Sequence, residues 1–263
     1  MNLKNMIKNP HLIFWSIFFI EFWVFMWAYV FGSQLPPIAE VIQRFTAAAY
    51  GNLLMISISS VAITLVQSIL YASKSIRFVT KYTSLSSTRF FIENLASSAL
   101  TLLIVSGIIF TSTLGIFSLR FGIPIIVENP LGLASITFLG MILIYSLSVM
   151  LGLLIIALRI PRFANFLSSL PLIFAFITYA NLWVDFKLAV YISPFNSLVS
   201  LIYYYFCGDI PPTGNYFMSG QKVLVDLNLA LIVVIGYILA FSMLSVALLR
   251  RTRGVSIEEI RLS

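Results

Sequence analysis

Long uncharged stretches alternate with short polar connections along this chain. Six of the stretches are long enough to cross a membrane as α-helices, which takes about 20 mostly apolar residues. They cover Leu12–Phe31, Thr46–Ala72, Leu95–Ser118, Leu131–Leu158, Phe163–Val184 and Leu227–Leu249. Only the first contains a charged residue, Glu21. The pattern predicts an all-α integral membrane protein with six transmembrane helices, in a single transmembrane domain that covers residues 1–263.

The Lys and Arg residues indicate how these spans are oriented. If the six helices alternate in direction, 12 of the 16 Lys and Arg residues lie on one side of the membrane. The other side holds only Arg44, Arg120, Lys187 and Lys222. Cytoplasmic loops carry the excess of basic residues. We therefore expect a multi-pass protein of the cell membrane, in contact with its lipids, with both termini in the cytoplasm.

A seventh apolar stretch, Leu188–Phe206, does not fit this alternation. If it crossed the membrane, the basic C-terminal tail would lie outside, against the charge bias. We interpret residues 188–207 as an outer re-entrant helical element between spans five and six. Ser193 and Pro194, followed by Phe195 and Asn196, are typical of a helix start, and Gly208 of a helix end. The alternative is an amphipathic helix that lies flat in the outer interface.

The inner connection 73–93 mixes basic residues with apolar ones. Arg77, Phe78, Lys81 and Tyr82 illustrate the pattern, which is typical of a short amphipathic helix at the membrane surface. The basic residues alone favour binding to anionic lipid headgroups. The second interpretation is a docking surface for a cytoplasmic partner, and composition does not separate the two.

Glu21 is the only acidic residue inside a predicted span. A carboxylate at the centre of a bilayer costs at least about 2.5–3.5 kcal/mol, so it should face protein or water, or be protonated. Its neighbours Phe18, Phe22 and Phe25 make the helix strongly aromatic. These four residues are the candidates for a substrate path. The alternative is a structural role for Glu21 in helix packing.

Composition excludes several classes of function. Hydrophobic residues make up 60% of the chain and charged residues 10%, whereas soluble domains carry roughly a quarter of charged residues. The basic residues behind the net charge of +7 lie next to the ends of the predicted spans, and no basic patch with stacking aromatics points to nucleic acid. The single His and single Cys provide no metal site or disulfide, and no phosphate-binding glycine loop is present. We expect no catalytic, cofactor-binding or metal-binding residue in this chain.

Taken together, these features resemble the membrane subunit of type-two ABC exporters. The features are the six spans with both ends inside, Asn9–Pro10 before the first span, the inner loop 73–91, and the run from Ser193–Pro194 to Cys207–Gly208. In that family the loop after span two carries a coupling helix that rests on an ATPase, and re-entrant helices lie between spans five and six. The N-terminal segment and the outer loops are shorter here than in many members.

The resemblance implies a permease subunit rather than an enzyme. Two permeases, identical or homologous, would pair across spans one and five. A cytoplasmic ABC ATPase dimer, which holds ATP and Mg²⁺, would drive export of an amphipathic, drug-like, lipid-like or glycan substrate. Two alternatives remain. One is a membrane scaffold subunit that transports nothing, and the other is a lipid-modifying membrane enzyme, which needs clustered acidic or histidine residues.

Overall fold

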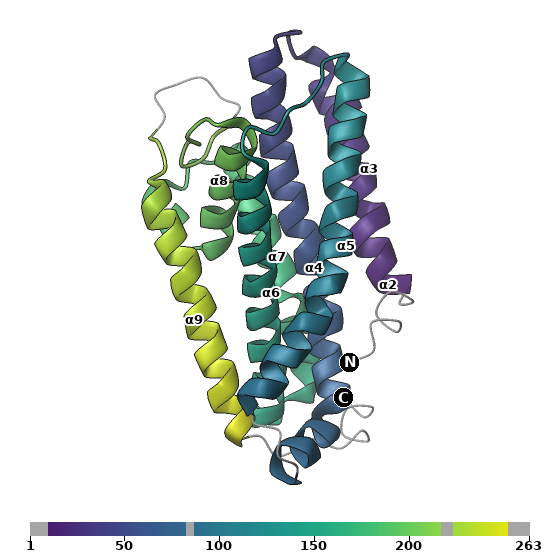
Figure 1. Cartoon of the computed structure of the whole chain (residues 1–263), viewed down its shortest axis with the longest axis vertical. Helices are drawn as coiled ribbons and strands as arrows, with labels where there is room; N and C mark the ends of the chain where they lie inside the picture. Colours follow the sequence, from purple (N-terminus) through teal and green to yellow (C-terminus); the bar gives the residue numbers. More distant parts are fainter. Residues whose placement is uncertain (1–9, 83–86, 217–222, 252–263) are drawn as a thin grey trace.

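The chain folds into an upright bundle of long helices that alternate in direction (Figure 1). The computed structural model describes the backbone of residues 10–82, 87–216 and 223–251, and their side chains except at 11, 72–97, 250 and 251. Five of the long helices are α4 (Ala39–Tyr82), α5 (Ser87–Phe121), α6 (Pro130–Leu158), α7 (Ala164–Tyr179) and α9 (Leu227–Arg251). In the described part, six helices are long and apolar enough to cross a membrane.

The sixth is the first helical run, residues 10–34, which is built from short pieces. They are α2 (Pro10–Ile13), η1 (Phe14–Phe18), α3 (Phe19–Phe25), η2 (Met26–Val30) and η3 (Phe31–Gln34). Two of these pieces, η1 and η2, are π-helical. π-Helical turns are rare in general and occur mostly as single wide turns within α-helices. The run is also rich in Phe and Trp, so two wide turns here carry mainly bulky side chains.

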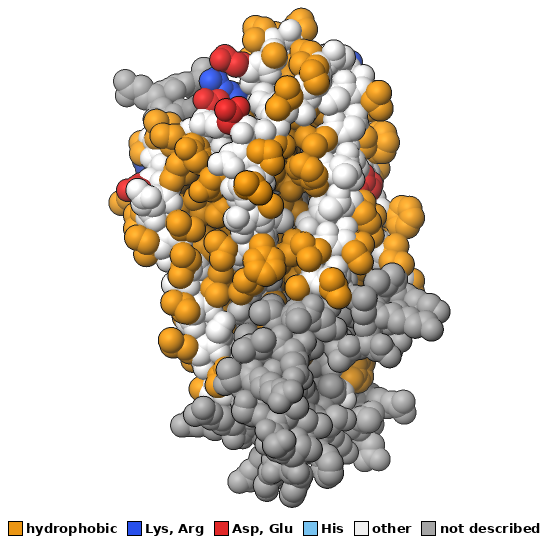
Figure 2. All heavy atoms as spheres, viewed as in Figure 1, with side chains coloured by type: hydrophobic (Ala, Val, Ile, Leu, Met, Phe, Trp, Pro, Cys, Tyr) orange, Lys and Arg blue, Asp and Glu red, His pale blue; other side chains and the backbone are white. Residues whose placement is uncertain are grey.

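Connections 35–38 and 122–129 and the described residues after α8, 208–216 and 223–226, meet at one end of the bundle, which we call the loop end. Backbone and side-chain contacts join them there, such as Glu128 N–H to the Phe206 carbonyl at 3.0 Å. In Figure 1 the helix α9 runs from the loop end to the opposite end of the bundle, and α2 lies well away from the loop end. Figure 2 shows charged side chains gathered near the loop end, above a belt of hydrophobic side chains.

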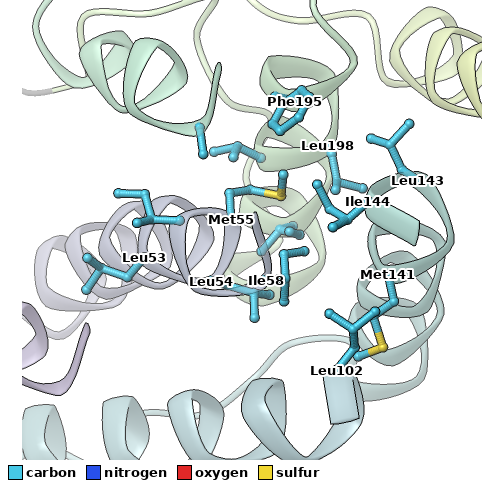
Figure 3. Close-up of a cluster of buried hydrophobic side chains, with 14 of the residues drawn as sticks. Leu53, Leu54, Met55, Ile58, Leu102, Met141, Leu143, Ile144, Phe195 and Leu198 are labelled. Atoms are coloured by element: carbon cyan, nitrogen blue, oxygen red, sulfur yellow. The ribbon is translucent and has the colours of Figure 1, made fainter. Parts of the chain in front are cut away.

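The core of the bundle lies along α4 and α6. In their most apolar stretches 83% and 72% of the residues are buried, against 39% or less in the other four spans. Side chains from α4, α5, α6 and α8 (Pro194–Cys207) meet there, as Figure 3 shows for Met55, Leu102, Met141 and Leu198. Because α4 and α6 occupy the centre, the other four spans form the outer surface.

The helix α8 starts deep in the bundle. A Cβ atom on Gly140, ten residues into α6, would lie 2.7 Å from Leu198 Cδ2. The hydroxyl of Tyr237, ten residues into α9, donates to the Ile192 carbonyl just before α8 at 2.8 Å. Ten helical residues correspond to about 15 Å. The chain therefore descends about half a membrane thickness between α7 and α8.

The other end of α8 returns to the loop end. Asn129 N–H, beside the start of α6, donates to the Tyr205 carbonyl at 3.1 Å. Gly208 follows as the C-cap with φ 81°, a left-handed conformation that glycine adopts without strain. Eleven of the fourteen residues of α8 are buried. The helix α8 packs against α4, α6, α7 and α9 and does not lie on the outside of the bundle.

The ends of α4 and α5 differ from the predicted connection at 73–93. The helix α4 continues to Tyr82, and α5 begins already at Ser87. No Gly or Pro occurs between Gly51 and Gly107, so nothing in the sequence breaks the helix at the membrane border. The end of an apolar run marks where a span leaves the membrane, which is not where the helix ends.

Candidate functional site

The predicted path residues on the first helical run lie on the outside of the bundle. Phe18, Phe22 and Phe25 are 65%, 56% and 51% exposed. Their spacing of four and three residues places them on one helix face. This face points away from the core of the chain, so the three rings lie on its outer surface. Lipid or a second chain has to cover them.

Glu21 lies at the border between this face and the bundle. Its carboxylate is half-buried and accepts a hydrogen bond from the Ser112 hydroxyl of α5 at 2.7 Å. A partner on a neighbouring helix offsets part of the desolvation of the carboxyl group. Glu21 therefore ties the first helical run to α5 and still has one side toward the surface.

Buried hydroxyl groups hold the first helical run against α4. The Ser16 and Ser60 hydroxyls lie 2.6 Å apart, and the Ser57 hydroxyl donates to the Ser16 carbonyl at 2.7 Å. Small side chains allow the two backbones to approach closely, as is typical of helix contacts in membranes. These contacts fix which face of the first helical run is turned inward, and so which face carries Phe18 and Phe22.

The first helical run also contacts α7, which is far away in the sequence. Trp27 Nε1–H donates to the Tyr179 hydroxyl at 2.9 Å. On α4, the buried amide of Asn52 lies 3.5 Å from that of Asn181, which follows α7 and is also buried. The first helical run and α7 therefore touch through the Trp27–Tyr179 pair, and both are mainly exposed, with only 28% and 22% of the residues of the two spans buried.

The predicted docking residues belong to the last turns of α4. Arg77 and Lys81 are four residues apart, and so are Phe78 and Tyr82, so each pair shares a helix face. Their side chains lie outside the described part of the chain, as do residues 83–86 of the connection. A helix of 44 residues is about 66 Å long, which is about twice the hydrocarbon thickness of a bilayer.

At the loop end, Asp185 organises the long connection between α7 and α9. Its carboxylate accepts a hydrogen bond from the Thr213 hydroxyl at 2.6 Å and another from the Lys187 backbone N–H at 2.9 Å. These bonds favour the ionised form, with the Thr213 contact the larger cause, and they lower the pKa of Asp185 below its usual 3.8. Asp185 therefore holds the two ends of this connection together.

Among the described residues, no group of three or more His, Cys, Asp or Glu side chains is placed to hold a metal ion. The single cysteine, Cys207, is half-buried at the end of α8, and its thiol donates to the Tyr203 carbonyl at 3.3 Å. Comparison with protein-family models, with characterised proteins and with solved structures finds no match to this chain.

Two long-range contacts at the loop end had no signal in the sequence. Arg44 in α4 forms an ion pair with Asp209, which follows α8, at 2.6 Å between Nε and Oδ2. The Trp27–Tyr179 hydrogen bond joins residues 152 positions apart. Each residue looks ordinary for a membrane border, where Trp, Tyr and Arg are common. Only the packing of the helices brings the partners together.

Proposed function

We propose that this chain is the membrane-spanning permease subunit of a type-two ABC exporter. One observation carries the proposal: between the fifth and sixth long helices the chain descends about 15 Å into the bundle and returns to the same end through a short buried helix, α8. Such a segment is tolerated in a membrane only where protein or water satisfies its backbone. Re-entrant helices at this place are what the resemblance to the exporter family implies.

In this proposal the loop end faces the outside of the cell. Its described acidic residues outnumber its described basic ones; they are Glu40, Glu128, Asp185, Asp209 and Asp226. The opposite end carries Arg159 and Arg162 between α6 and α7. Basic residues concentrate on the cytoplasmic side of membrane proteins. Both chain termini are then cytoplasmic, and α8 is re-entrant from the outside.

The translocation path would form between two permease subunits. The exposed faces of the first helical run and α7 are the proposed contact, with Phe18, Phe22 and Phe25 beside the path and Glu21 at its border. Aromatic rings with one carboxylate suit an amphipathic substrate, which has an apolar part and a polar part. The extended end of α4, with Arg77 and Tyr82, would rest on the ATPase.

Purification from native membranes tests the ATPase assignment. The tagged chain, extracted in mild detergent, should carry along an ATPase whose activity depends on it. Joint replacement of Arg77, Phe78 and Tyr82 by Ala should abolish this association, whereas Lys187→Ala at the loop end should leave it intact. A monodisperse chain that carries no ATPase would refute the exporter and favour a scaffold subunit or a lipid-modifying enzyme.

Cross-linking tests the pairing of two copies, or of this chain with a homologous one. In a Cys207→Ser background, Phe22→Cys should form a disulfide-linked or bismaleimide-linked dimer in native membranes. Met243→Cys on α9 is the matched control, because Met243 is exposed in the same way on a helix outside the proposed contact. Equal cross-linking at both positions would indicate random collision and would contradict the proposed dimer.

Glu21→Gln separates the two roles of Glu21. The variant removes the negative charge but retains an oxygen that accepts the Ser112 hydrogen bond. We expect normal assembly with the ATPase and reduced stimulation of ATP hydrolysis in lipid nanodiscs. Ser112→Ala, which removes the hydrogen bond but retains the charge, is the control. Unchanged hydrolysis in Glu21→Gln, together with loss of assembly in Ser112→Ala, would assign Glu21 a structural role only.

A further inference from the structure

A pocket at the loop end has features of a ligand-binding site that the proposed function does not use. Its volume is about 670 Å³, within the range of roughly 300–1,000 Å³ that is typical of small-molecule sites. The lining comes from the start of α4, the end of α8 and the connection that follows α8. The backbone bonds between Thr213 N–H and the Val223 carbonyl, and between Val225 N–H and the Pro211 carbonyl, fix its outer wall.

The pocket contains an ion pair whose arginine can still bind another group. Arg44 and Asp209 both line it, and their side chains are 50% and 45% exposed. Arg44 bonds to Asp209 through Nε, and among the described residues its terminal N–H groups have no hydrogen-bond partner. A guanidinium group binds phosphate or carboxylate through two such N–H groups. Opening an exposed ion pair costs little, so a ligand can separate the two side chains.

Two tyrosine rings stand next to this ion pair. Tyr203 and Tyr216 line the pocket with ring centroids 5.3 Å apart and planes inclined by 67°. Tyr203 lies close enough to Arg44 and Asp209 to interact with the charge of each. Aromatic rings set at an angle to one another form the cages that bind quaternary ammonium groups, through the negative faces of the rings. Asp209 adds a full negative charge beside these rings.

The rest of the lining is apolar. Phe45 and Ala48 close the side toward the core, and Leu35, Val41 and Leu224 lie toward the surface. An alkyl chain can occupy this part without leaving a polar group unpaired. The pocket thus combines a site for an anion, a site for a cation and an apolar channel.

We propose that this pocket binds a zwitterionic amphiphile, with a phosphate on Arg44, a quaternary ammonium group against the Tyr203–Tyr216 pair beside Asp209, and an alkyl chain along Phe45. The charges favour a zwitterion over simpler ligands. An anionic amphiphile that takes Arg44 leaves Asp209 unpaired, and a cationic one leaves Arg44 unpaired. Only a zwitterion gives each member of the opened ion pair a new partner. Binding here requires neither an ATPase nor a second copy of the chain.

Protection of an introduced cysteine from labelling tests the proposal on the full chain in nanodiscs. The reporter is Val41→Cys in a Cys207→Ser background, and the measured quantity is the rate of modification by a membrane-impermeant maleimide. The probes share one alkyl length: lysophosphatidylcholine, the anionic lysophosphatidylglycerol, an alkyltrimethylammonium and a neutral monoacylglycerol. Free phosphocholine tests the headgroup alone. Leu188→Cys, exposed at the same end but outside the pocket, corrects for effects on the lipid disc.

We expect lysophosphatidylcholine to protect the introduced thiol of the Val41→Cys reporter at a concentration at least about tenfold lower than any of the other probes, the difference typical of one charge-assisted hydrogen bond. Arg44→Gln and Asp209→Asn should each remove this preference, and Lys187→Gln should retain it. Equal protection by all the alkyl probes would overturn the headgroup assignment. Equal protection by free phosphocholine would overturn the assignment of the alkyl chain. No protection by any probe would overturn the site. The comparison among probes on the Val41→Cys reporter stands even if the Arg44 or Asp209 variant fails to fold.

Discussion

The packing of α8 against α6 provides a direct test of the fold through Gly140→Ala. A Cβ atom at this position would lie 2.7 Å from Leu198 Cδ2, well inside the distance of about 3.5–4.0 Å at which two carbon atoms make favourable contact. Leu198 is fully buried, and Figure 3 shows it among Met55, Leu143 and Ile144. The leucine therefore cannot turn away without disturbing other core side chains.

The size of the effect follows from two opposing contributions. Extra volume in a packed core costs about 1–3 kcal/mol. Replacing Gly by Ala inside a helix returns up to about 1 kcal/mol. We expect Gly140→Ala to lower the free energy of unfolding by about 1–2 kcal/mol. For a chain of this size the melting temperature then falls by about 2–8 °C.

The assay is thermal unfolding in detergent, followed by size-exclusion chromatography of the protein that remains monodisperse. Gly107→Ala is the matched control, since it is the same substitution inside α5 and its Cβ would meet nothing within 4 Å. We expect Gly107→Ala to melt at or slightly above the temperature of the wild type. If Gly140→Ala melts as high as Gly107→Ala, α8 does not pack against α6 at this depth and the reasoning is refuted.

Two further predictions concern polar contacts. Trp27→Phe and Tyr179→Phe each remove the hydrogen bond between the first helical run and α7, and each should lower stability by about 0.5–1 kcal/mol. In a double-mutant cycle of melting temperatures, the double variant should lose less than the sum of the two single losses. Strict additivity would show that the bond does not form. The lowered pKa of Asp185 stabilises the fold at pH values above the carboxyl's usual 3.8, and this contribution is lost as the pH falls through the folded-state pKa. Asp185→Asn should therefore melt lower than the wild type at pH 7 and lose less on acidification to about pH 3, and parallel melting curves would contradict this.

The membrane spans were largely predictable, because their signal is local. A window of about 20 apolar residues defines a span whatever its neighbours are, and each of the six predicted stretches overlaps one of the six membrane-length helical runs in the described part of the chain. The start of α8 at Pro194 and its Gly208 cap also follow from local backbone preferences. The end of α4 was missed because hydropathy does not register a helix that continues into water.

The site was less predictable, because the way a helix face points and the distant residues that its side chains contact depend on packing. The spacing of Phe18, Phe22 and Phe25 shows that they share a face, but an aromatic face suits the core, lipid and a second chain equally well. Contacts with other helices, such as that between Ser16 and Ser60, decide that the rings point outward. Arg44 and Asp209 are 165 residues apart, and no pattern within the sequence connects them.

The depth of α8 has a consequence for the order in which the protein is built at the ribosome. Its 14 residues are about 21 Å long, too short to partition into the bilayer as a spanning segment. Asn196, Ser197 and Ser200 are buried on it, and in hydrocarbon they would lack the partners that the bundle provides. One of its walls, α9, is synthesised after it. We therefore expect α8 to remain outside the hydrocarbon during translation and to pack into the bundle last, after α9 has been inserted.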